Sequence, residues 1–419
     1  MVKVSVIIPC YNVEPYISDC LKSVCAQTLQ EIEVICIDDG STDGTLNILE
    51  EYRSQNNNLY IISQKNQGSG IARNHGIDVA TGEYLAFMDA DDFYPAQDTL
   101  EKMYCTAKRE KAEICGGSGC TFRNGIYTYS GLRKGFTFSE DGWIDKRDYP
   151  VILGYWRFIY KREFIKQNNI YFPDYLRCQD PPFFLNAVVD AGRLYCMKEL
   201  TYVYRKEHKQ VLFTLRKAID YAKGMRDSLA IAKAGGLLAI QQLILNELHG
   251  ELSALMYLYA EKDDEMKRII CQFNEMIPDN DTANGEDWRL KEGKEIAPYI
   301  RNVQKEMSSL LEHLKTEEKV LIYGAGTVGK RVKAFLEENG VSPEAFVVSD
   351  TRQNADSLDG LQIRGIDDYV DRKDDCMVVI ATFPYLHEQI EYTLREKKFK
   401  KVYTLSLEKL HLFSGRVIH

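Results

Sequence analysis

Short apolar runs alternate with segments of helical periodicity over about the first 115 residues. The runs suit strands that are buried on both faces, and the segments between them place apolar side chains three or four positions apart. The predicted strands are residues 4–9, 33–38, 59–63 and 84–88, and the predicted helices are 15–27, 45–53 and 69–80. This alternation predicts an α/β fold with a largely parallel sheet covered by helices.

The pattern changes three times further along the chain. Residues 116–208 are irregular and rich in Tyr, Phe and Trp, as expected of a half-domain that closes over the same sheet edge. Residues 209–315 carry an apolar stripe at helical spacing, and strand–turn–helix alternation returns near residue 319. We therefore predict three domains: a catalytic domain at 1–208, a helical region at 209–315 and a small Rossmann-like domain at 316–419.

Composition narrows the function classes. The 419 residues carry a net charge of −9, which argues against a broad nucleic-acid-binding surface. The apolar start of the chain breaks at Pro9, too early for a signal peptide, and the longest apolar stretch contains several polar residues. Eleven cysteines without CxxC pairs indicate reduced thiols. We expect a cytoplasmic protein that meets any anionic substrate through a metal ion or a few cationic side chains.

Polar segments follow three of the predicted strands. They are residues 9–12, residues 38–43 and the acidic cluster Asp89, Asp91 and Asp92. The carboxyl ends of parallel strands meet at one edge of a sheet, which is where such folds bind ligands. Carboxylates with substrate phosphate oxygens are the usual ligands of Mg²⁺ or Mn²⁺. A solvated turn whose carboxylates cap the following helix is the alternative for the acidic cluster taken alone.

Residues 4–45 and 66–92, which include "VSVIIPCYN", "CIDDGSTDGT" and "YLAFMDADD" in that order, resemble the family 2 glycosyltransferases. The resemblance implies the GT-A nucleotide-sugar-binding fold. It also implies transfer of a sugar from a nucleotide diphosphate to an acceptor hydroxyl, with inversion of configuration at the anomeric carbon. The donor that we favour is a UDP-sugar; a strand-end carboxylate can accept the imide N–H of uracil or thymine, which cytosine lacks.

The same resemblance assigns roles by position. Pro9, Tyr11 and Asp39 would hold the nucleotide base, and Arg73 would lie near the diphosphate. Each also has a plain structural reading: Tyr11 as a packing aromatic, Asp39 as a turn former and Arg73 as a surface residue of its helix.

In the D-x-D motif Asp89-Ala90-Asp91, the resemblance implies that Asp89 lies near the ribose or the metal ion. It implies that Asp91 ligates Mn²⁺ or Mg²⁺ directly. A divalent ion there would offset the charge of a diphosphate leaving group in a chain without a large basic patch.

The catalytic base of the family matches Asp180 in "YLRCQDPPFFLNAV". An inverting transfer needs such a group to take the acceptor proton; capping the helix that follows is the structural alternative for Asp180. Gln179 stands where the family usually has Glu; its amide can still donate a hydrogen bond to the acceptor or the sugar but carries no charge. Tyr155 and Trp156 match the acceptor-side wall, although core packing explains them equally well.

The segment "YVYRKEHKQ" resembles a family segment that often supplies a His or Arg to the metal ion or the diphosphate. His208 is one residue away from the usual spacing, so Arg205 is the better phosphate contact.

The C-terminal "GAGTVGK" fits G-x-G-x-x-G between a predicted strand and a helix. Gly324, Gly326 and Gly329 would accept NAD or another nucleotide, with Asp350 near the ribose. Tight strand–helix packing around an empty pocket is the alternative. The motif resembles small Rossmann-like domains that are appended to bacterial sugar transferases.

The combined reading is a metal-dependent inverting glycosyltransferase of bacterial cell-surface polysaccharide or glycolipid synthesis. Its acceptor would be a saccharide or a lipid-linked saccharide, and peripheral association with the inner membrane face is plausible for such an enzyme. Two alternatives stay open: an NAD-dependent oxidoreductase that uses the C-terminal unit, and a nucleotide-sugar-binding protein without turnover.

Overall fold

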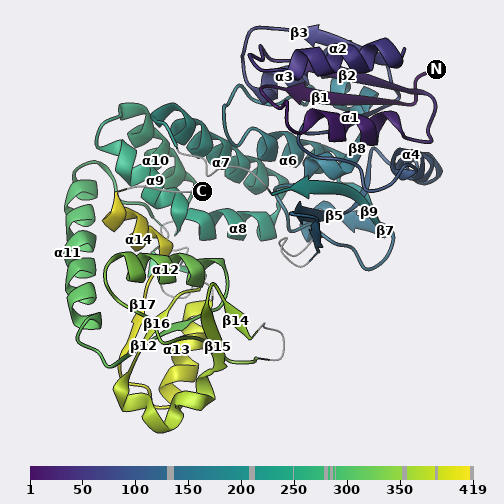
Figure 1. Ribbon diagram of the computed structural model, residues 1–419. Coiled ribbons are helices and arrows are strands. Elements are labelled where there is room, and N and C mark those ends of the chain that lie inside the picture. Colours follow the sequence, from purple (N-terminus) through teal and green to yellow (C-terminus); the bar gives the residue numbers. More distant parts are fainter. Residues whose placement is uncertain are drawn as a thin grey trace. The chain divides into compact units, whose positions relative to one another are not determined.

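The computed structural model describes residues 1–129, 136–206, 213–248, 250–277, 282–283, 286–287, 289–351, 356–382 and 386–415. The chain forms two compact units, Met1–Ile244 and Leu245–His419. Each unit is built around its own sheet (Figure 1). The predicted boundaries at 208/209 and 315/316 remain predictions.

The N-terminal unit contains a nine-stranded sheet in the order β3-β2-β1-β4-β8-β5-β9-β7, with β6 paired to β5. Its strands are β1 (Val4–Cys10), β2 (Ile32–Asp38), β3 (Leu59–Ser63), β4 (Tyr84–Phe87), β5 (Ile114–Arg123), β6 (Ile126–Thr128), β7 (Gly142–Asp145), β8 (Phe158–Lys161) and β9 (Arg193–Arg205). The strands β3, β2, β1 and β4 are parallel to one another, while β8 runs antiparallel between β4 and β5. The predicted α/β fold with a mostly parallel sheet is therefore confirmed.

Helices connect and cover these strands. They are α1 (Ile17–Cys25), α2 (Thr45–Gln55), α3 (Ser69–Val79), α4 (Thr99–Glu110), α5 (Arg162–Gln167), α6 (Asp180–Ala191), α7 (Leu215–Gly235) and α8 (Leu238–Leu248), with 3₁₀ turns η1 (Lys146–Asp148) and η2 (Tyr155–Arg157). Helix α3 packs closely on β1, because a Cβ at Gly76 would clash with the side chain of Ile7. This close approach brings the polar residues at the start of α3 to the carboxyl edge of the sheet.

The C-terminal unit contains a six-stranded sheet in the order β14-β15-β13-β12-β16-β17. Its strands are β12 (Lys319–Tyr323), β13 (Ala345–Val348), β14 (Ser357–Leu358), β15 (Leu361–Gly365), β16 (Cys376–Ile380) and β17 (Val402–Thr404); β10 (Thr282–Ala283) pairs with β11 (Glu286–Asp287) separately. Its helices are α9 (Glu251–Ala260), α10 (Asp264–Met276), α11 (Ile296–Leu314), α12 (Thr327–Glu338), α13 (His387–Glu396) and α14 (Leu407–Ser414), with η3 (Gly293–Glu295) and η4 (Ile366–Asp375).

Both cores are formed by the apolar runs that the sequence pattern identifies. All of β2 is buried, and so are all residues of β1 except the half-buried Pro9. All eleven cysteines are free thiols, as the sequence predicts. Among the described residues, none of the helices combines the length and the apolar character that a membrane span requires.

Candidate active site

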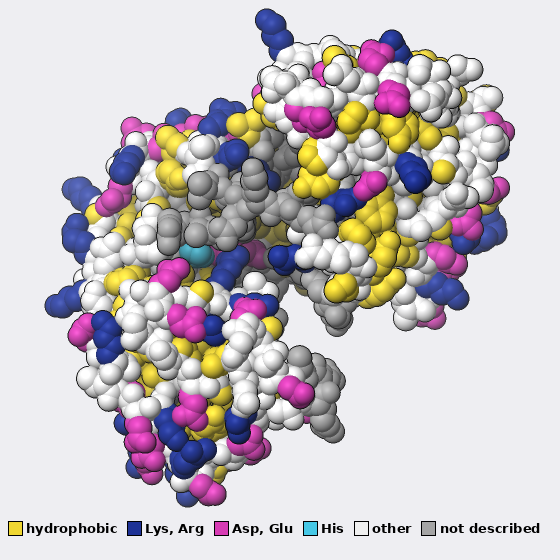
Figure 2. All heavy atoms as spheres, in the orientation of Figure 1, with side chains coloured by type: hydrophobic (Ala, Val, Ile, Leu, Met, Phe, Trp, Pro, Cys, Tyr) yellow, Lys and Arg dark blue, Asp and Glu magenta, His cyan; other side chains and the backbone are white. Residues whose placement is uncertain are grey.

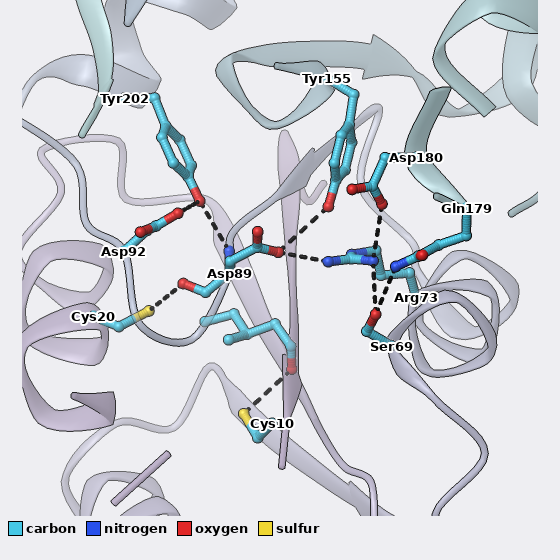
Figure 3. A network of polar contacts seen from close by, with 11 residues as sticks. Cys10, Cys20, Ser69, Arg73, Asp89, Asp92, Tyr155, Gln179, Asp180 and Tyr202 are labelled. Atoms are coloured by element: carbon cyan, nitrogen blue, oxygen red, sulfur yellow. Dashed lines mark hydrogen bonds and ion pairs between the residues drawn. The ribbon is translucent and has the colours of Figure 1, made fainter. Parts of the chain in front are cut away.

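Three parallel strands deliver polar residues to one edge of the N-terminal sheet. The register of β1 with β2 and β4 aligns their carboxyl ends, so the segments beginning at Tyr11, Asp39 and Asp89 leave the sheet on the same side. Helix α3 adds Arg73, and helix α6 adds Asp180. Figure 3 shows Arg73 lying between the carboxylates of Asp89 and Asp180.

Arg73 links these two carboxylates. Its Nη2 donates to Oδ1 of Asp89 at 2.6 Å, and its Nη1 lies 3.4 Å from Oδ1 of Asp180. The guanidinium sits 5.3 Å from the ring centroids of both Tyr155 and Phe172, and only 5% of the side chain is exposed. Because an arginine stays charged when it is buried, a permanent cation lies between the two acidic groups.

Asp180 is the first residue of α6. Pro181 and Pro182 follow it in the first turn, where a missing backbone N–H costs no helical hydrogen bond. Burial raises the pKa of the Asp180 carboxyl to about 6, against the opposing effect of Arg73 and with a smaller raising effect from Asp89. About 29% of its side chain remains exposed. The pKa of Asp180 thus lies near the neutral range, and a small polar group can still reach its carboxylate. Both properties suit a general base.

Gln179 contacts the same network through its amide. Its Nε2 donates to the hydroxyl of Ser69 at 2.9 Å, and that hydroxyl also accepts from Nη1 of Arg73 at 3.3 Å. Only 7% of Gln179 is exposed. The neutral amide therefore fixes the start of α6 against α3 without placing a second buried charge beside Asp180.

Asp39 follows β2 and is 2% exposed. Its carboxylate accepts three hydrogen bonds of 2.8 Å, from Nε2 of Gln64 and from the backbone N–H groups of Gln67 and Gly68. The turn-forming role that the sequence left open is therefore present. Tyr11, by contrast, is 49% exposed above this edge, next to the half-buried Pro9.

The acidic turn after β4 holds the carboxylates of Asp89 and Asp92 in different ways. Asp89 is held by Arg73, with 25% of its side chain exposed, and also accepts from the hydroxyl of Tyr155 at 3.3 Å. Asp92 is fully buried. Its Oδ2 accepts from the hydroxyl of Tyr202 at 2.8 Å and its Oδ1 from the backbone N–H of Arg205 at 2.7 Å. Burial raises the pKa of Asp92, and the neighbouring carboxylates add to the effect.

Arg205 also contacts the acidic turn. Its Nε donates to the carbonyl oxygen of Asp91 at 2.8 Å, and its Nη2 pairs with Asp19 of α1 at 2.9 Å. It lines a pocket of about 380 Å³ together with Lys22 and Phe93. His208 lies outside the described residues.

Tyr155 and Trp156 belong to the aromatic core. Tyr155 is fully buried and contacts the site through its hydroxyl and through the ring face that packs against Arg73, while Trp156 stacks on Tyr202 with ring centroids 4.0 Å apart. The core-packing alternative therefore describes them. Sequence reasoning missed Ser69 and Tyr202, because a hydroxyl that supports a site carries no motif of its own.

No group of three or more His, Cys, Asp or Glu side chains is arranged to hold a metal ion by itself within the described parts of the chain. An ion at Asp91 could take further oxygen ligands from a bound molecule, such as phosphate oxygens.

The glycine motif of the C-terminal unit connects β12 to α12. A Cβ at Gly324, whose φ is +121°, would lie 2.6 Å from the carbonyl oxygen of Ala381, and a Cβ at Gly329 would clash with the carbonyl oxygen of Gly324. Among the described residues, nothing lies within 4 Å of such a Cβ at Gly326. Asp350 follows β13 and is exposed. Packing therefore explains Gly324 and Gly329 but leaves Gly326 unexplained.

Comparisons with known proteins agree with this geometry. Residues 5–169 match the model of the family described as glycosyl transferase family 2. The uncharacterized glycosyltransferase EpsJ of Bacillus subtilis is 32% identical over 217 residues, which cover 48% of this chain and 61% of that protein. The poly(ribitol-phosphate) beta-glucosyltransferase of Bacillus spizizenii is 27% identical over 370 residues, covering 83% of this chain and 56% of that protein. The chain thus spans about three fifths of the length of these two curated relatives.

The fold also resembles a crystal structure of Staphylococcus aureus TarS, residues 1–349, in complex with UDP. The TM-score is 0.53 at 24% identity, covering 66% of this chain and 81% of the other. The structural similarity supports the fold, and the sequence matches confirm the resemblance that residues 4–45 and 66–92 indicated.

Proposed function

This chain carries a glycosyl transferase family 2 domain, and from that premise we propose that it is an inverting glycosyltransferase. It would transfer a sugar from a nucleotide diphosphate sugar to an acceptor hydroxyl. The observation that carries the proposal is Asp180, a partly exposed carboxylate with a pKa of about 6 at the strand-end site. Arg73 connects it to the acidic turn (Figure 3).

In the proposed reaction Asp180 takes the proton of the acceptor hydroxyl. The acceptor oxygen then forms a bond to the anomeric carbon, and the bond between that carbon and the diphosphate oxygen breaks. The leaving nucleoside diphosphate keeps the electron pair, and Asp180 keeps the proton. Attack from the face opposite the leaving group inverts the anomeric configuration.

The donor nucleotide would bind across the carboxyl ends of β1 and β2. Tyr11 is exposed enough to stack on a base, and Pro9 would line the same side. The Asp39 carboxylate holds the 64–68 loop, but each of its oxygens has two lone pairs, so it can accept the imide N–H of uracil as well. UDP is the nucleotide that we favour, and the UDP complex of the structurally similar TarS supports this choice.

A divalent ion fits the chemistry of this edge. Asp91 is partly exposed on the acidic turn, and hard carboxylate oxygens with diphosphate oxygens suit Mg²⁺ or Mn²⁺. When bound, the ion would offset the negative charge that develops on the leaving diphosphate. Arg73 would act beside it by keeping Asp89 in place rather than by clamping phosphate freely, because its nitrogens already contact Asp89, Asp180 and Ser69.

The acceptor that we propose is a cell-surface polysaccharide or its lipid-linked precursor. The relative from Bacillus spizizenii, whose name specifies a poly(ribitol-phosphate) acceptor, supports this class. Such an acceptor would be met on the cytoplasmic side, with peripheral contact to the membrane.

The deciding experiment measures thermal stabilisation by UDP, dTDP, CDP, GDP and NAD, each with and without Mn²⁺, followed by transfer assays with the matching nucleotide sugars. Stabilisation by UDP that requires Mn²⁺, and that Asp91→Ala abolishes, supports the donor site. Loss of transfer in Asp180→Asn with UDP affinity retained supports the base. UDP binding without transfer to any acceptor tested would instead favour a binding protein without turnover.

We propose a second, separate nucleotide site in the C-terminal unit. The observation that favours it is Gly326, where no atom of the described residues lies within 4 Å of a Cβ. In a G-x-G-x-x-G turn the second glycine allows the backbone to approach a diphosphate. Stabilisation by NAD that Gly326→Val removes, with UDP binding unchanged, would support this site.

A further inference from the structure

The hydroxyl of Tyr202 joins two positions of the acidic turn. It donates to Oδ2 of Asp92 at 2.8 Å and accepts from the backbone N–H of Asp89 at 3.0 Å (Figure 3). Tyr202 lies on β9, more than one hundred residues away in sequence. One side-chain oxygen therefore fixes the entry and the exit of the segment that contains the D-x-D motif.

The surroundings leave this hydroxyl little freedom. Tyr202 and Asp92 are both fully buried. The Tyr202 ring stacks on Trp156 at an interplanar angle of 29°, and Trp156 stacks in turn near Tyr204 at 11°. Because a tyrosine hydroxyl is coplanar with its ring, packing that fixes the ring also fixes the hydroxyl.

The backbone of β9 also forms hydrogen bonds with the acidic turn and the residue that follows it. Phe93 and Val203 exchange backbone hydrogen bonds of 3.4 and 3.1 Å. The backbone N–H of Arg205 donates to Oδ1 of Asp92. Asp91 thus lies in the chain between Asp89 and Asp92, and both of these residues are hydrogen-bonded to β9.

We propose that Tyr202 is a positioning residue for the nucleotide-sugar site, which holds the acidic turn in the geometry that directs Asp89 and Asp91 toward the donor. The inference rests on the proposed function, because the geometry of the acidic turn affects catalysis only if a nucleotide sugar binds there. In this role Tyr202 acts through the main chain of Asp89 and the side chain of Asp92 rather than through a contact of its own with the donor.

The test compares Tyr202→Phe with Tyr160→Phe. Tyr160 is also fully buried, and its hydroxyl donates to the carbonyl oxygen of Tyr155 at 2.7 Å, outside the acidic turn. Both changes delete one hydroxyl and keep an aromatic ring. We expect Tyr202→Phe to weaken Mn²⁺-dependent UDP binding about tenfold, because both hydrogen bonds that this hydroxyl makes to the acidic turn are lost, and to raise KM for the donor more than it lowers kcat. Tyr160→Phe should leave both unchanged.

A second readout does not depend on the ligand. Hydrogen exchange of the peptide that spans residues 88–93 should accelerate in Tyr202→Phe and stay at the wild-type rate in Tyr160→Phe. If Tyr202→Phe unfolds, the double variant Tyr202→Phe/Asp92→Asn replaces the buried carboxyl that has lost its tyrosine partner, and the same losses are expected in it.

The two hypotheses can fail separately. A wild-type chain that binds no nucleotide overturns the proposed function, and the exchange measurement still tests whether Tyr202 holds the turn. Wild-type behaviour of Tyr202→Phe in both UDP binding and exchange, in a chain that does transfer sugar, overturns the positioning role alone.

Discussion

Arg73 donates through Nη2 to Oδ1 of Asp89 at 2.6 Å, and 5% of the arginine side chain is exposed. The same guanidinium reaches Asp180 through its other terminal nitrogen. The acidic turn and the proposed base therefore share one buried cation, so a change at either carboxylate is felt by the other.

Replacing Arg73 by Gln should destabilise the protein by about 3 kcal/mol, because removing one partner of a buried ion pair leaves an uncompensated charge. Unfolding in urea monitored by fluorescence measures this. Arg162→Gln is a suitable control, since that arginine uses one nitrogen to donate to the carbonyl oxygen of Gly82 away from the site. Equal losses in both variants would contradict a special role for Arg73.

The pH dependence of transfer should report Asp180. A base works when it is deprotonated, and burial raises the pKa of Asp180 to about 6, so kcat/KM should rise with pH up to about 6 and then level off. Asp180→Asn should lower kcat by at least about a hundredfold above about pH 6, and the difference from wild type should shrink at more acidic pH, where Asp180 is protonated. Its folded state should be no less stable at pH 7, because a carboxyl whose folded pKa is raised loses stability as pH increases through that value. A profile that is flat between pH 5 and 7 would contradict this assignment.

Gln179→Glu restores the residue that is usual in the family, yet we expect it to impair this chain at neutral pH. The new carboxylate would be largely buried beside Asp180, and like charges disfavour ionisation. The acidic limb of the pH profile should move to higher pH by about one unit. The hydrogen bond with Ser69 would then have to run from the serine hydroxyl to the new carboxylate. Gln64→Glu, remote from Asp180 and bonded to Asp39, provides the comparison. An unchanged acidic limb in Gln179→Glu would show that the Gln179 amide does not influence the pKa of Asp180.

The sequence predicted the sheet and the gathering of strand ends because both follow from local periodicity and from the rules of parallel connections. It could not predict which polar groups face a ligand and which form hydrogen bonds with other parts of the protein. Asp39 and Arg205 were both assigned to substrate, and both prove to be heavily engaged with the chain: Asp39 holds the 64–68 loop, and Arg205 pairs with Asp19 and the carbonyl of Asp91. Such partners are distant in sequence, and only tertiary packing brings them together. Tyr202 was missed for the same reason.

Substitutions at the glycines of the C-terminal unit should distinguish a packing role from a ligand-binding role. Gly324→Ala places a side chain at φ +121° and 2.6 Å from the carbonyl oxygen of Ala381, so it should lower the stability of this unit by about 2 kcal/mol or more. Gly326→Ala meets no atom within 4 Å and has a φ of −107°, so unfolding should change by about 0.5 kcal/mol or less. Thermal unfolding of the full chain measures both. Because Gly326 has no packing reason to be glycine, any loss of NAD or nucleotide binding in Gly326→Ala can be attributed to the ligand, whereas equal destabilisation by both changes would mean that the whole turn serves strand–helix packing.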